Sequence, residues 1–476
     1  MSQLCAIVLA AGHGKRMRSA LPKVMHLLSG RPLVHYPIQR AIEAGATRVV
    51  VVVGHERERV APYLLETFGD KVSLAVQHEQ LGTGHAALQG LPWLPDDADR
   101  TLVLYGDTPL LVASDLVRLA DALDRAPDAS LAMLTCTTSD PAGYGRILRD
   151  PTGRVTGVRE DRDLTDTERN IREVNPGVYC ARVDFLATAL AGLRPDNAQG
   201  ELYLTDVVAL AAVRHAVVDV AGDPSSLVGI NDRAQLGEAD RMMQRRIIDA
   251  LRRSGVTIGE GVRIDDTVRI EPDATIEANV VLRGSTRVAS GARIDVGTVV
   301  DNAEIGPGAW VKPYCVITDS VVGPQAQLGP FAHLRPQTVV GEGAHLGNFV
   351  ETKKTVLHKG AKANHLAYLG DGEIGEGANV GAGTIFCNYD GFQKHKTVIG
   401  RGAFIGSDSQ IVAPVTVGEN AYVATGTTVT RDVPPDALAI ARVRQENKEG
   451  YASKLRQRLA AAKAAAMSNK APGEQS

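Results

Sequence analysis

The stretch LAAGHGKRM, residues 9–17, combines glycines with basic side chains and could bind an anion. Gly12 and Gly14 permit a tight backbone whose amide groups can converge on a phosphate. The basic residues within this stretch and shortly after it are Lys15, Arg16, Arg18 and Lys23. The spacing matches neither GxxxxGKS/T nor GxGxxG, so it predicts no P-loop and no dinucleotide fingerprint. By itself the loop fits a phosphate site and a solvated basic turn equally well.

Asp107 lies in TLVLYGDTPLL, directly after an apolar run that predicts a buried strand. Open α/β sheets bind their ligands at the carboxyl ends of the strands. Mg²⁺ is commonly held there by one or two carboxylates together with substrate phosphates. Asp107 and the basic loop together therefore favour a metal-assisted phosphate site over a turn residue that bonds its own backbone.

A second polar group surrounds ANHLAYLGD, residues 363–371, inside a long repeat of six residues. Between Leu346 and Ile374 we expect this register to fail, and a further interruption, FCNYDGFQKHK, inserts a basic loop before Ile399. Loops that leave a rigid repeat are where function is usually found. The polar members of the group are Glu351, Lys353, Lys354, His358, Lys359, His365 and Tyr368.

His365 is suited to general-base chemistry because the unperturbed pKa of histidine is about 6.5. We expect the chain to leave the repeat here in order to place a base and several cations at one edge. The alternative is that His365 caps a corner while the lysines are solvated. A single histidine would favour that alternative, but the cluster favours a site.

The segments that must position the basic loop and Asp107 predict an α/β domain. Short apolar runs at 49–53, 101–105 and 131–135 predict buried strands, and ASDLVRLADALDRA predicts a helix with Ser114 or Asp115 as its cap. This alternation favours a mostly parallel sheet covered by helices. Residues 232–254 predict a charged connecting helix that Gly255 ends.

The second group lies in a chain with a period of six, which neither an α-helix nor a flat strand produces. Such periodicity is typical of a parallel β-helix, in which the aliphatic residue points inward and Gly or Asn takes the corner. The repeating positions are Ile258, Ile264, Ile270, Ile276, Leu282, Val288, Ile294, Val300, Ile305, Val311, Ile317, Val322, Leu328, Leu334, Val340, Leu346, Ile399, Ile405, Ile411, Val417, Val423 and Val429.

Length and composition bound the alternatives. With 476 residues, 44% hydrophobic and 22% charged, the chain is expected to be an ordinary globular protein of several domains. A net charge of −3 excludes a globally basic nucleic-acid binder. Five scattered cysteines without a CxxC pair, no secretory leader and no apolar run of roughly 18 residues predict a cytoplasmic protein without disulfides or a membrane span.

The chain is expected to divide into a nucleotide-site domain at 1–231, the linker helix at 232–254, the β-helix at 255–445 and a tail at 446–476. The tail is rich in Ala and Lys before it becomes polar. We expect it to form a short helix with a frayed end.

Taken together, LAAGHGKRM, LPKV, EQLGTGHA and YGD resemble the sugar-1-phosphate nucleotidyltransferases. With GYGRI, GINDR and the hexapeptide repeats, the chain closely resembles the bacterial bifunctional N-acetylglucosamine-1-phosphate uridylyltransferase/glucosamine-1-phosphate acetyltransferase family over all but about the last 25 residues. The resemblance implies an α/β Rossmann-like nucleotidyltransferase domain followed by a left-handed parallel β-helix. It also implies Mg²⁺, the substrates UTP, N-acetylglucosamine 1-phosphate, glucosamine 1-phosphate and acetyl-CoA, and a homotrimer in the cytoplasm.

For the uridylyltransferase half, the resemblance implies that Arg16 and Lys23 bind phosphates and that Asp107 and Asn231 bind the metal. No protein nucleophile is required. Lys15 and Pro176 stand where the family has threonines, and Pro176 lacks a backbone donor. The nucleotide and sugar contacts implied are Leu9, Ala10, Ala11, Gly12, Gln77, Gly82, Thr83, Tyr105, Gly106, Gly145, Glu160 and Asn175.

For the acetyltransferase half, the resemblance implies that His365 takes a proton from the sugar ammonium and that Glu351 orients it. Thr425 replaces a family alanine. The sugar-phosphate contacts implied are Arg335, Lys353, Tyr368 and Asn379. The acetyl-CoA contacts implied are Ala382, Asn388, Tyr389, Ser407, Thr425 and Arg442.

Two other readings of the sequence compete with this one. The β-helix could be a regulatory or assembly module on a single-activity nucleotidyltransferase, but a bare scaffold would not need NHLAYLGD, Lys353 and Arg442. The chain could also be a non-catalytic trimeric scaffold with a ligand-sensing front domain, against which Asp107 and the basic loop weigh.

Overall fold

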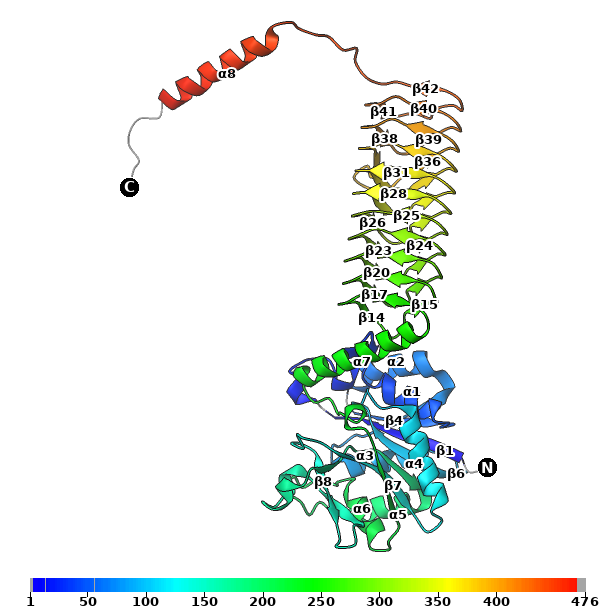
Figure 1. Ribbon diagram of the computed structural model, residues 1–476, viewed down its shortest axis with the longest axis vertical. Helices are drawn as coiled ribbons and strands as arrows, with labels where there is room; N and C mark the ends of the chain where they lie inside the picture. Colours follow the sequence, from blue (N-terminus) through cyan, green and yellow to red (C-terminus); the bar gives the residue numbers. More distant parts are fainter. Residues whose placement is uncertain (1–2, 13, 55, 469–476) are drawn as a thin grey trace. The chain divides into compact units, whose positions relative to one another are not determined.

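The protein is described from a computed structural model that covers residues 3–12, 14–54 and 56–468 (Figure 1). The chain divides into two compact units, Met1–Asp319 and Ser320–Ser476. None of the helices in the part of the chain described is long and apolar enough to cross a membrane.

The first unit is built on a mixed sheet with the strand order β5-β4-β1-β6-β11-β7-β10-β8-β9, to which β12 adds by pairing with β7. Strands β5, β4, β1 and β6 are parallel, whereas β11 runs antiparallel to β6 and β7. The strands are β1 Gln3–Ala10, β4 Val49–Val53, β5 Val72–Val76, β6 Ala98–Tyr105, β7 Leu131–Thr137, β8 Gly145–Arg149, β9 Val155–Arg159, β10 Glu173–Asn175, β11 Tyr179–Arg182 and β12 Val217–Ala221.

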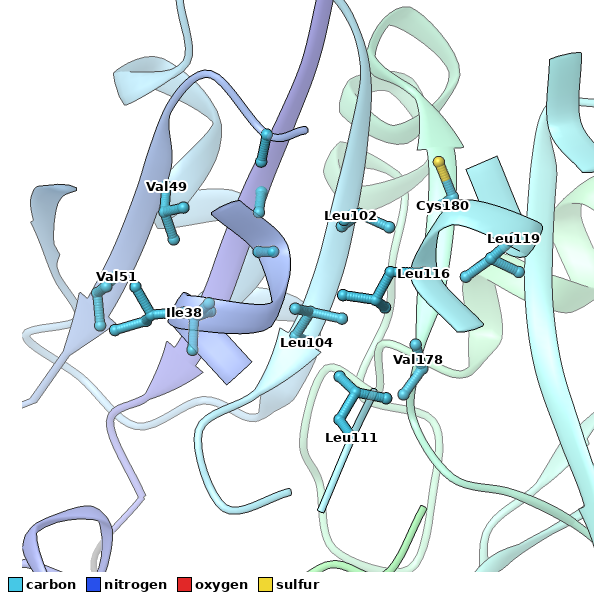
Figure 2. Close-up of a cluster of buried hydrophobic side chains, with 14 of the residues drawn as sticks. Ile38, Val49, Val51, Leu102, Leu104, Leu111, Leu116, Leu119, Val178 and Cys180 are labelled. Carbon is cyan, nitrogen blue, oxygen red and sulfur yellow. The ribbon is translucent and has the colours of Figure 1, made fainter. Parts of the chain in front are cut away.

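Helices cover both faces of this sheet, because alternate residues of its central strands point to opposite sides. In β4, Val49 and Val51 join one apolar cluster while Val50 and Val52 join the other. Figure 2 shows Ile38, Leu116 and Leu119 of the first cluster beside Leu102 and Leu104 of β6. The helices are α1 His35–Glu43, α2 Arg57–Phe68 and α4 Ala113–Arg125 on the first side, and α3 Thr83–Gly90, α5 Val183–Ala191 and α6 Asp206–Ala212 on the second.

The predicted strands and helix of this unit are confirmed as β4, β6, β7 and α4. The predicted cap of α4 is wrong. The helix follows Val112 without a side-chain cap, because Asp115 lies buried inside the first turn. There its carboxylate pairs with Arg118 at 3.2 Å and accepts a hydrogen bond from Ser226.

The predicted connecting helix is α7, Arg233–Arg253, which Asp232 caps and Gly255 follows in a left-handed conformation. Within the first unit it lies beside β14 (Figure 1). Buried Gln244 donates to Ser29 Oγ at 3.0 Å and to Ile264 O at 2.7 Å, and it accepts from Ile264 N at 2.9 Å. Ser29 lies in the turn of a small hairpin, β2 Leu27–Leu28 and β3 Arg31–Pro32.

The hexapeptide repeats form coils of three short parallel strands. In the first unit the orders are β13-β16-β19-β22, β14-β17-β20-β23 and β15-β18-β21. These strands are β13 Thr257–Ile258, β14 Arg263–Ile264, β15 Arg269–Ile270, β16 Thr275–Ile276, β17 Val281–Arg283, β18 Arg287–Val288, β19 Arg293–Ile294, β20 Val299–Asp301, β21 Glu304–Ile305, β22 Trp310–Val311 and β23 Val316–Thr318.

The second unit repeats the pattern as β25-β28-β31-β34-β37-β40-β42, β26-β29-β32-β35-β38-β41 and β24-β27-β30-β33-β36-β39. Its strands are β24 Val321–Val322, β25 Gln327–Leu328, β26 His333–Leu334, β27 Val339–Val340, β28 His345–Asn348, β29 Glu351–Lys353, β30 Val356–Leu357, β31 Lys362–His365, β32 Tyr368–Gly370, β33 Gly372–Ile374, β34 Asn379–Val380, β35 Ile385–Cys387, β36 Thr397–Ile399, β37 Phe404–Ile405, β38 Gln410–Val412, β39 Val415–Val417, β40 Tyr422–Val423, β41 Thr428–Val429 and β42 Leu438–Ala439.

These sheets confirm the predicted left-handed β-helix of hexapeptide repeats. Every predicted inward residue is buried except Ile270, which is half-buried. Several corners are taken by residues with positive φ, among them Asn279, Asn302 and Asn420. The remaining elements are the 3₁₀ turns Lys15–Met17, Lys23–Met25, Gly69–Lys71, Leu91–Trp93, Asp161–Asp163, Glu168–Asn170 and Pro224–Ser226, and α8 Tyr451–Ser468 in the tail, which has no buried residue.

The expectation that the repeat fails between Leu346 and Ile374 is wrong. The coils continue there, with Thr352, Leu357 and Ala363 fully buried at the inward positions. A threonine, a small alanine and two repeats that are one residue shorter hide the pattern. The loop predicted from FCNYDGFQKHK is confirmed between β35 and β36.

Candidate active sites

A cavity of about 320 Å³ lies where β1 and β6 end, at the carboxyl edge expected for a ligand in this fold. Leu9 pairs in register with Tyr105, so the glycine-rich loop and the Asp107 loop leave the sheet side by side. The cavity is lined by Leu9, Ala10, Ala11, Gly12, Lys23, Val24, Gln77, Gln80, Gly82, Thr83, Ala86, Tyr105, Asp107 and Glu201.

A second cavity, of about 650 Å³, lies beyond the basic loop. Lys23 lines both cavities, so the two cavities adjoin at this side chain. The walls are formed by Gly14, Arg16, Lys23, Gly143, Glu160, Asp161, Arg162, Gln199 and Asn231.

Polar contacts gather the predicted phosphate and metal residues. The ammonium of Lys23 forms an ion pair with the Asp107 carboxylate, and both side chains are mostly buried. Arg16 donates to Asn231 Oδ1 at 2.8 Å. The amide of Ile230 donates to the Asp107 carbonyl at 2.9 Å, which holds the segment carrying Asn231 beside the Asp107 loop. The side chain of Lys15 lies outside the described residues.

Two glutamines tie the loops around the first cavity together. Gln77 Nε2 donates to Gly82 O at 3.1 Å, and Gln80 Nε2 donates to Ala11 O at 2.6 Å. Thr83 Oγ1 accepts from the amide of Leu204 at 3.1 Å. The strand ends therefore face a shell of loops that are linked to each other by hydrogen bonds.

Glu160 lines the second cavity and is held by a residue that sequence reasoning missed. Thr205 Oγ1 donates to Glu160 Oε1 at 2.9 Å. Burial, assisted by the nearby carboxylate of Asp206, raises the pKa of Glu160 above its usual value. The two residues are 45 positions apart, so no local pattern could have found the pair.

Three predicted sugar and nucleotide residues line neither cavity. Asn175 is buried, where its Nδ2 donates to Tyr179 Oη at 2.6 Å and its Oδ1 accepts from Gly177 N at 3.1 Å. Gly145 is its register partner in β8, and Gly106 donates to Leu9 O at 2.9 Å.

Gly177 is a further residue that sequence reasoning missed. Its φ is +78°, and a Cβ added there would overlap the ring of Tyr105. Burial raises the pKa of Tyr105, so its hydroxyl stays protonated. Gly177 therefore lets the Tyr105 ring lie against the backbone while it lines the first cavity.

In the second unit, the predicted acetyl-transfer residues gather at a corner of two adjacent coils. His365 ends β31 and pairs in register with Asn348, while Tyr368 begins β32 and pairs with Glu351. Glu351 and His365 thus flank the same corner on neighbouring coils, and His365 is exposed.

Cations lie along β29, the strand that leaves this corner, and beside it. Arg335 forms an ion pair with Glu351 at 2.8 Å. The pKa of Lys353 is lowered, first by Lys394 and then by Arg335, which shows three positive charges close together. Lys394 was missed as a site residue because it belongs to the inserted loop, where a β-bridge joins it to Tyr389. Such a cluster favours a phosphate.

The predicted acetyl-CoA residues lie on successive coils of the same unit. Ala382 O accepts from Asp408 N at 2.7 Å, and Ser407 O accepts from Gly426 N at 2.9 Å. Arg442 donates to the carbonyl of Thr425. Asn379 begins β34, the neighbour of β31, and pairs in register with Lys362.

Comparison with known proteins gives the family. Residues 6–173 match the MobA-like NTP transferase domain, and residues 396–431 match six bacterial transferase hexapeptide repeats. A bifunctional protein GlmU of Sorangium cellulosum is 62% identical over 96% of this chain and 97% of its own length. The chain belongs to the bifunctional GlmU family.

Other GlmU relatives cover a similar share of the chain. The protein of Geotalea uraniireducens is 47% identical over 95% of this chain and 99% of its own length, and that of an Anaeromyxobacter strain is 52% identical over 95% and 93%. Membership of the GlmU family confirms the predicted bifunctional enzyme, which joins a nucleotidyltransferase to a hexapeptide acetyltransferase.

Proposed function

We propose that the first half transfers UMP from UTP to N-acetylglucosamine 1-phosphate and releases pyrophosphate. The main support for this proposal is that Lys23 lines both cavities. A nucleotide in the smaller cavity and a sugar phosphate in the larger one would meet at its ammonium group. Arg16, at the wall of the larger cavity, adds a second cation.

The residues present fit a Mg²⁺ ion. Among the described residues no group of three His, Cys, Asp or Glu side chains could hold a metal, so a site must rely on substrate oxygens, as Mg²⁺ sites commonly do. Asp107 and Asn231 would contribute a carboxylate and an amide oxygen. Bound Mg²⁺ would supply charge neutralisation at the phosphates.

The transfer itself needs positioning more than covalent chemistry. An oxygen of the sugar phosphate attacks the α-phosphorus of UTP, and the bond to the pyrophosphate oxygen breaks. Lys23 and Arg16 stabilise the negative charge that develops. Gln77, Gly82 and Thr83 hold the base, Tyr105 the ribose side, and Glu160 accepts a hydrogen bond from a sugar hydroxyl.

We propose that the second half first makes the acceptor by acetylating glucosamine 1-phosphate. His365 takes the proton of the sugar ammonium, and the amine then attacks the thioester carbon of acetyl-CoA. The new C–N bond forms as the C–S bond breaks, and CoA leaves as a thiolate that takes up a proton. Arg335 and Lys353 hold the sugar phosphate, and Lys394 joins them.

A homotrimer is the proposed assembly, with domains at 1–231 and 255–445 joined by the helix at 232–254. A ridge of exposed apolar residues follows the corner beside His365: Phe331, Phe349 and Leu366, of which the two phenylalanine rings stack at 5.3 Å. Such a ridge suits contact with a second copy of the chain. No disulfide joins any of the five cysteines, all of which lie among the described residues, and this suits the proposed cytoplasmic location.

The test is a single incubation of the purified protein with glucosamine 1-phosphate, acetyl-CoA, UTP and Mg²⁺, followed by mass spectrometry. UDP-N-acetylglucosamine, free CoA and pyrophosphate are the expected products. Product formed only from N-acetylglucosamine 1-phosphate would remove the acetyl assignment. No product from either sugar would remove both.

A further inference from the structure

Asp371 follows β32, at the opposite end of that strand from the corner beside His365, and has no role in the proposed reaction. Its backbone amide donates to Lys353 O at 2.9 Å, and its carbonyl accepts from Thr397 N at 3.1 Å. It therefore connects the strand of a phosphate-binding residue with the end of the inserted loop. Its φ is +51°, a conformation that Asp and Asn adopt more readily than most residues.

The Asp371 side chain binds Asn388, one of the proposed acetyl-CoA residues. Asn388 Nδ2 donates to Asp371 Oδ2 at 2.6 Å. A carboxylate can only accept hydrogen bonds, so the carboxamide must turn its nitrogen toward Asp371 and its oxygen away. The Asn388 side chain is nine-tenths or more buried, and within the described residues its Oδ1 accepts no hydrogen bond.

Gly370 allows these groups to meet. A Cβ at Gly370 would overlap Tyr368 Oη and would come within 2.6 Å of Asn388 Nδ2. The phenol of Tyr368, a proposed sugar contact, and the carboxamide of Asn388 thus both lie over the backbone of Gly370. Asn388 Oδ1 therefore lies near a proposed sugar contact, where it could accept a hydrogen bond from a substrate.

We propose that Asp371 is a positioning residue that fixes the Asn388 carboxamide with Oδ1 free to accept a hydrogen bond from an N–H group of a substrate. This inference rests on the proposed acetyl transfer. Two substrates carry such a group: the amino sugar through its nitrogen, and acetyl-CoA through the amides of its pantetheine arm.

The first test is Asp371→Asn, which keeps the size and the left-handed backbone but lets the two amides pair in either orientation. We expect kcat/KM for acetyl transfer to fall about tenfold, the usual scale for a hydrogen bond to a charged group. The substrate whose KM rises identifies the donor. Uridylyl transfer by the same preparation is expected to remain unchanged.

The matched control is Asp436→Asn, at another positive-φ corner of the same unit, φ +58°, with an exposed side chain. It should leave both activities within twofold of the wild type. Asp371→Asn with KM values and kcat equally close to the wild type would overturn the inference. Absence of acetyl transfer by the wild-type protein would instead overturn the proposed function and this inference with it.

A charge swap separates positioning from simple support of the fold. Asn388→Asp places two carboxylates together and should nearly abolish acetyl transfer. In the double variant Asp371→Asn/Asn388→Asp, the amide can donate to the new carboxylate, whose second oxygen still accepts. We expect the double variant to be at least about fivefold more active than Asn388→Asp alone. Equal activities would overturn the inference.

Discussion

At the scale of the residue, the proposed uridylyltransferase site centres on Lys23, which lines both cavities. Lys23→Ala removes the charge that faces both ligands. We expect kcat for uridylyl transfer to fall about 10²–10³-fold, as when a preorganised charge stabiliser is lost. Acetyl transfer, measured by CoA release, should not change. Lys71→Ala, an exposed lysine of the same unit, is the control.

Gly177 gives a second prediction. Gly177→Ala forces a left-handed alanine and pushes the Tyr105 ring, so we expect the free energy of unfolding to fall by about 2–4 kcal/mol. Gly153→Ala is the matched control, because Gly153 also has a positive φ, +86°, but no atom lies within 4 Å of the added Cβ. It should cost only about 1 kcal/mol. Denaturant unfolding of both variants measures the difference, and equal losses would show that Tyr105 moves freely.

The raised pKa of Glu160 predicts the direction in which the stability of the protein changes with pH. The folded state binds the proton more tightly than the unfolded state, so unfolding releases it and stability falls as pH rises through the interval between the two pKa values. Glu160→Gln should remove this decrease from a pH series of thermal unfolding. The contribution of Glu160 to the acidic limb of uridylyl kcat/KM should disappear as well, because the amide does not titrate.

Several residues that a sequence motif named lie at the cavities, whereas residues that act through tertiary contacts could not be named from the sequence. The basic loop and Asp107 were found because strand, glycines and charge are adjacent in sequence. Thr205, Gly177 and Lys394 were missed, since each acts through a partner brought close only by the fold.

At the scale of the element, α7 holds the first hexapeptide coil against the hairpin that follows Lys23. Gln244→Leu would remove the side chain that bonds the backbone of Ile264 and one of the partners of Ser29, which still donates to Asp240 Oδ1. We expect a loss of about 2–3 kcal/mol in the free energy of unfolding. Arg241→Ala, exposed on the same helix, should change it by less than about 0.5 kcal/mol. Chemical denaturation distinguishes the two, and a Gln244 variant as stable as the Arg241 variant would contradict this account.

The elements themselves show what periodicity can and cannot reveal. Aliphatic residues six apart predicted the coils almost everywhere. The pattern was lost at Thr352 and Ala363 although the coils continue, because a buried threonine and an alanine also fill inward positions. The backbone conformation defines each repeat. The sequence reveals a repeat only where the inward-pointing residue is aliphatic.

At the scale of the whole molecule, the two proposed activities use separate residues and a diffusible intermediate. Lys23→Ala should still acetylate, and His365→Ala should still uridylylate N-acetylglucosamine 1-phosphate. Mixing the two variants should therefore restore formation of UDP-N-acetylglucosamine from glucosamine 1-phosphate, as followed by mass spectrometry. Failure of the mixture, with each half-reaction intact, would indicate that the intermediate is passed on within one assembly.

The loop between Cys387 and Thr397 lengthens one coil while the strands on either side keep their partners above and below. A corner of this β-helix can therefore accept extra residues without disturbing its neighbours. A single residue added within a strand would instead move the side chains that follow it in that strand from the inner face to the outer face. New specificity in such a scaffold can therefore come from longer corners as well as from side chains on its faces. Families built on it should differ most in the lengths of their corners and least in the spacing along their faces.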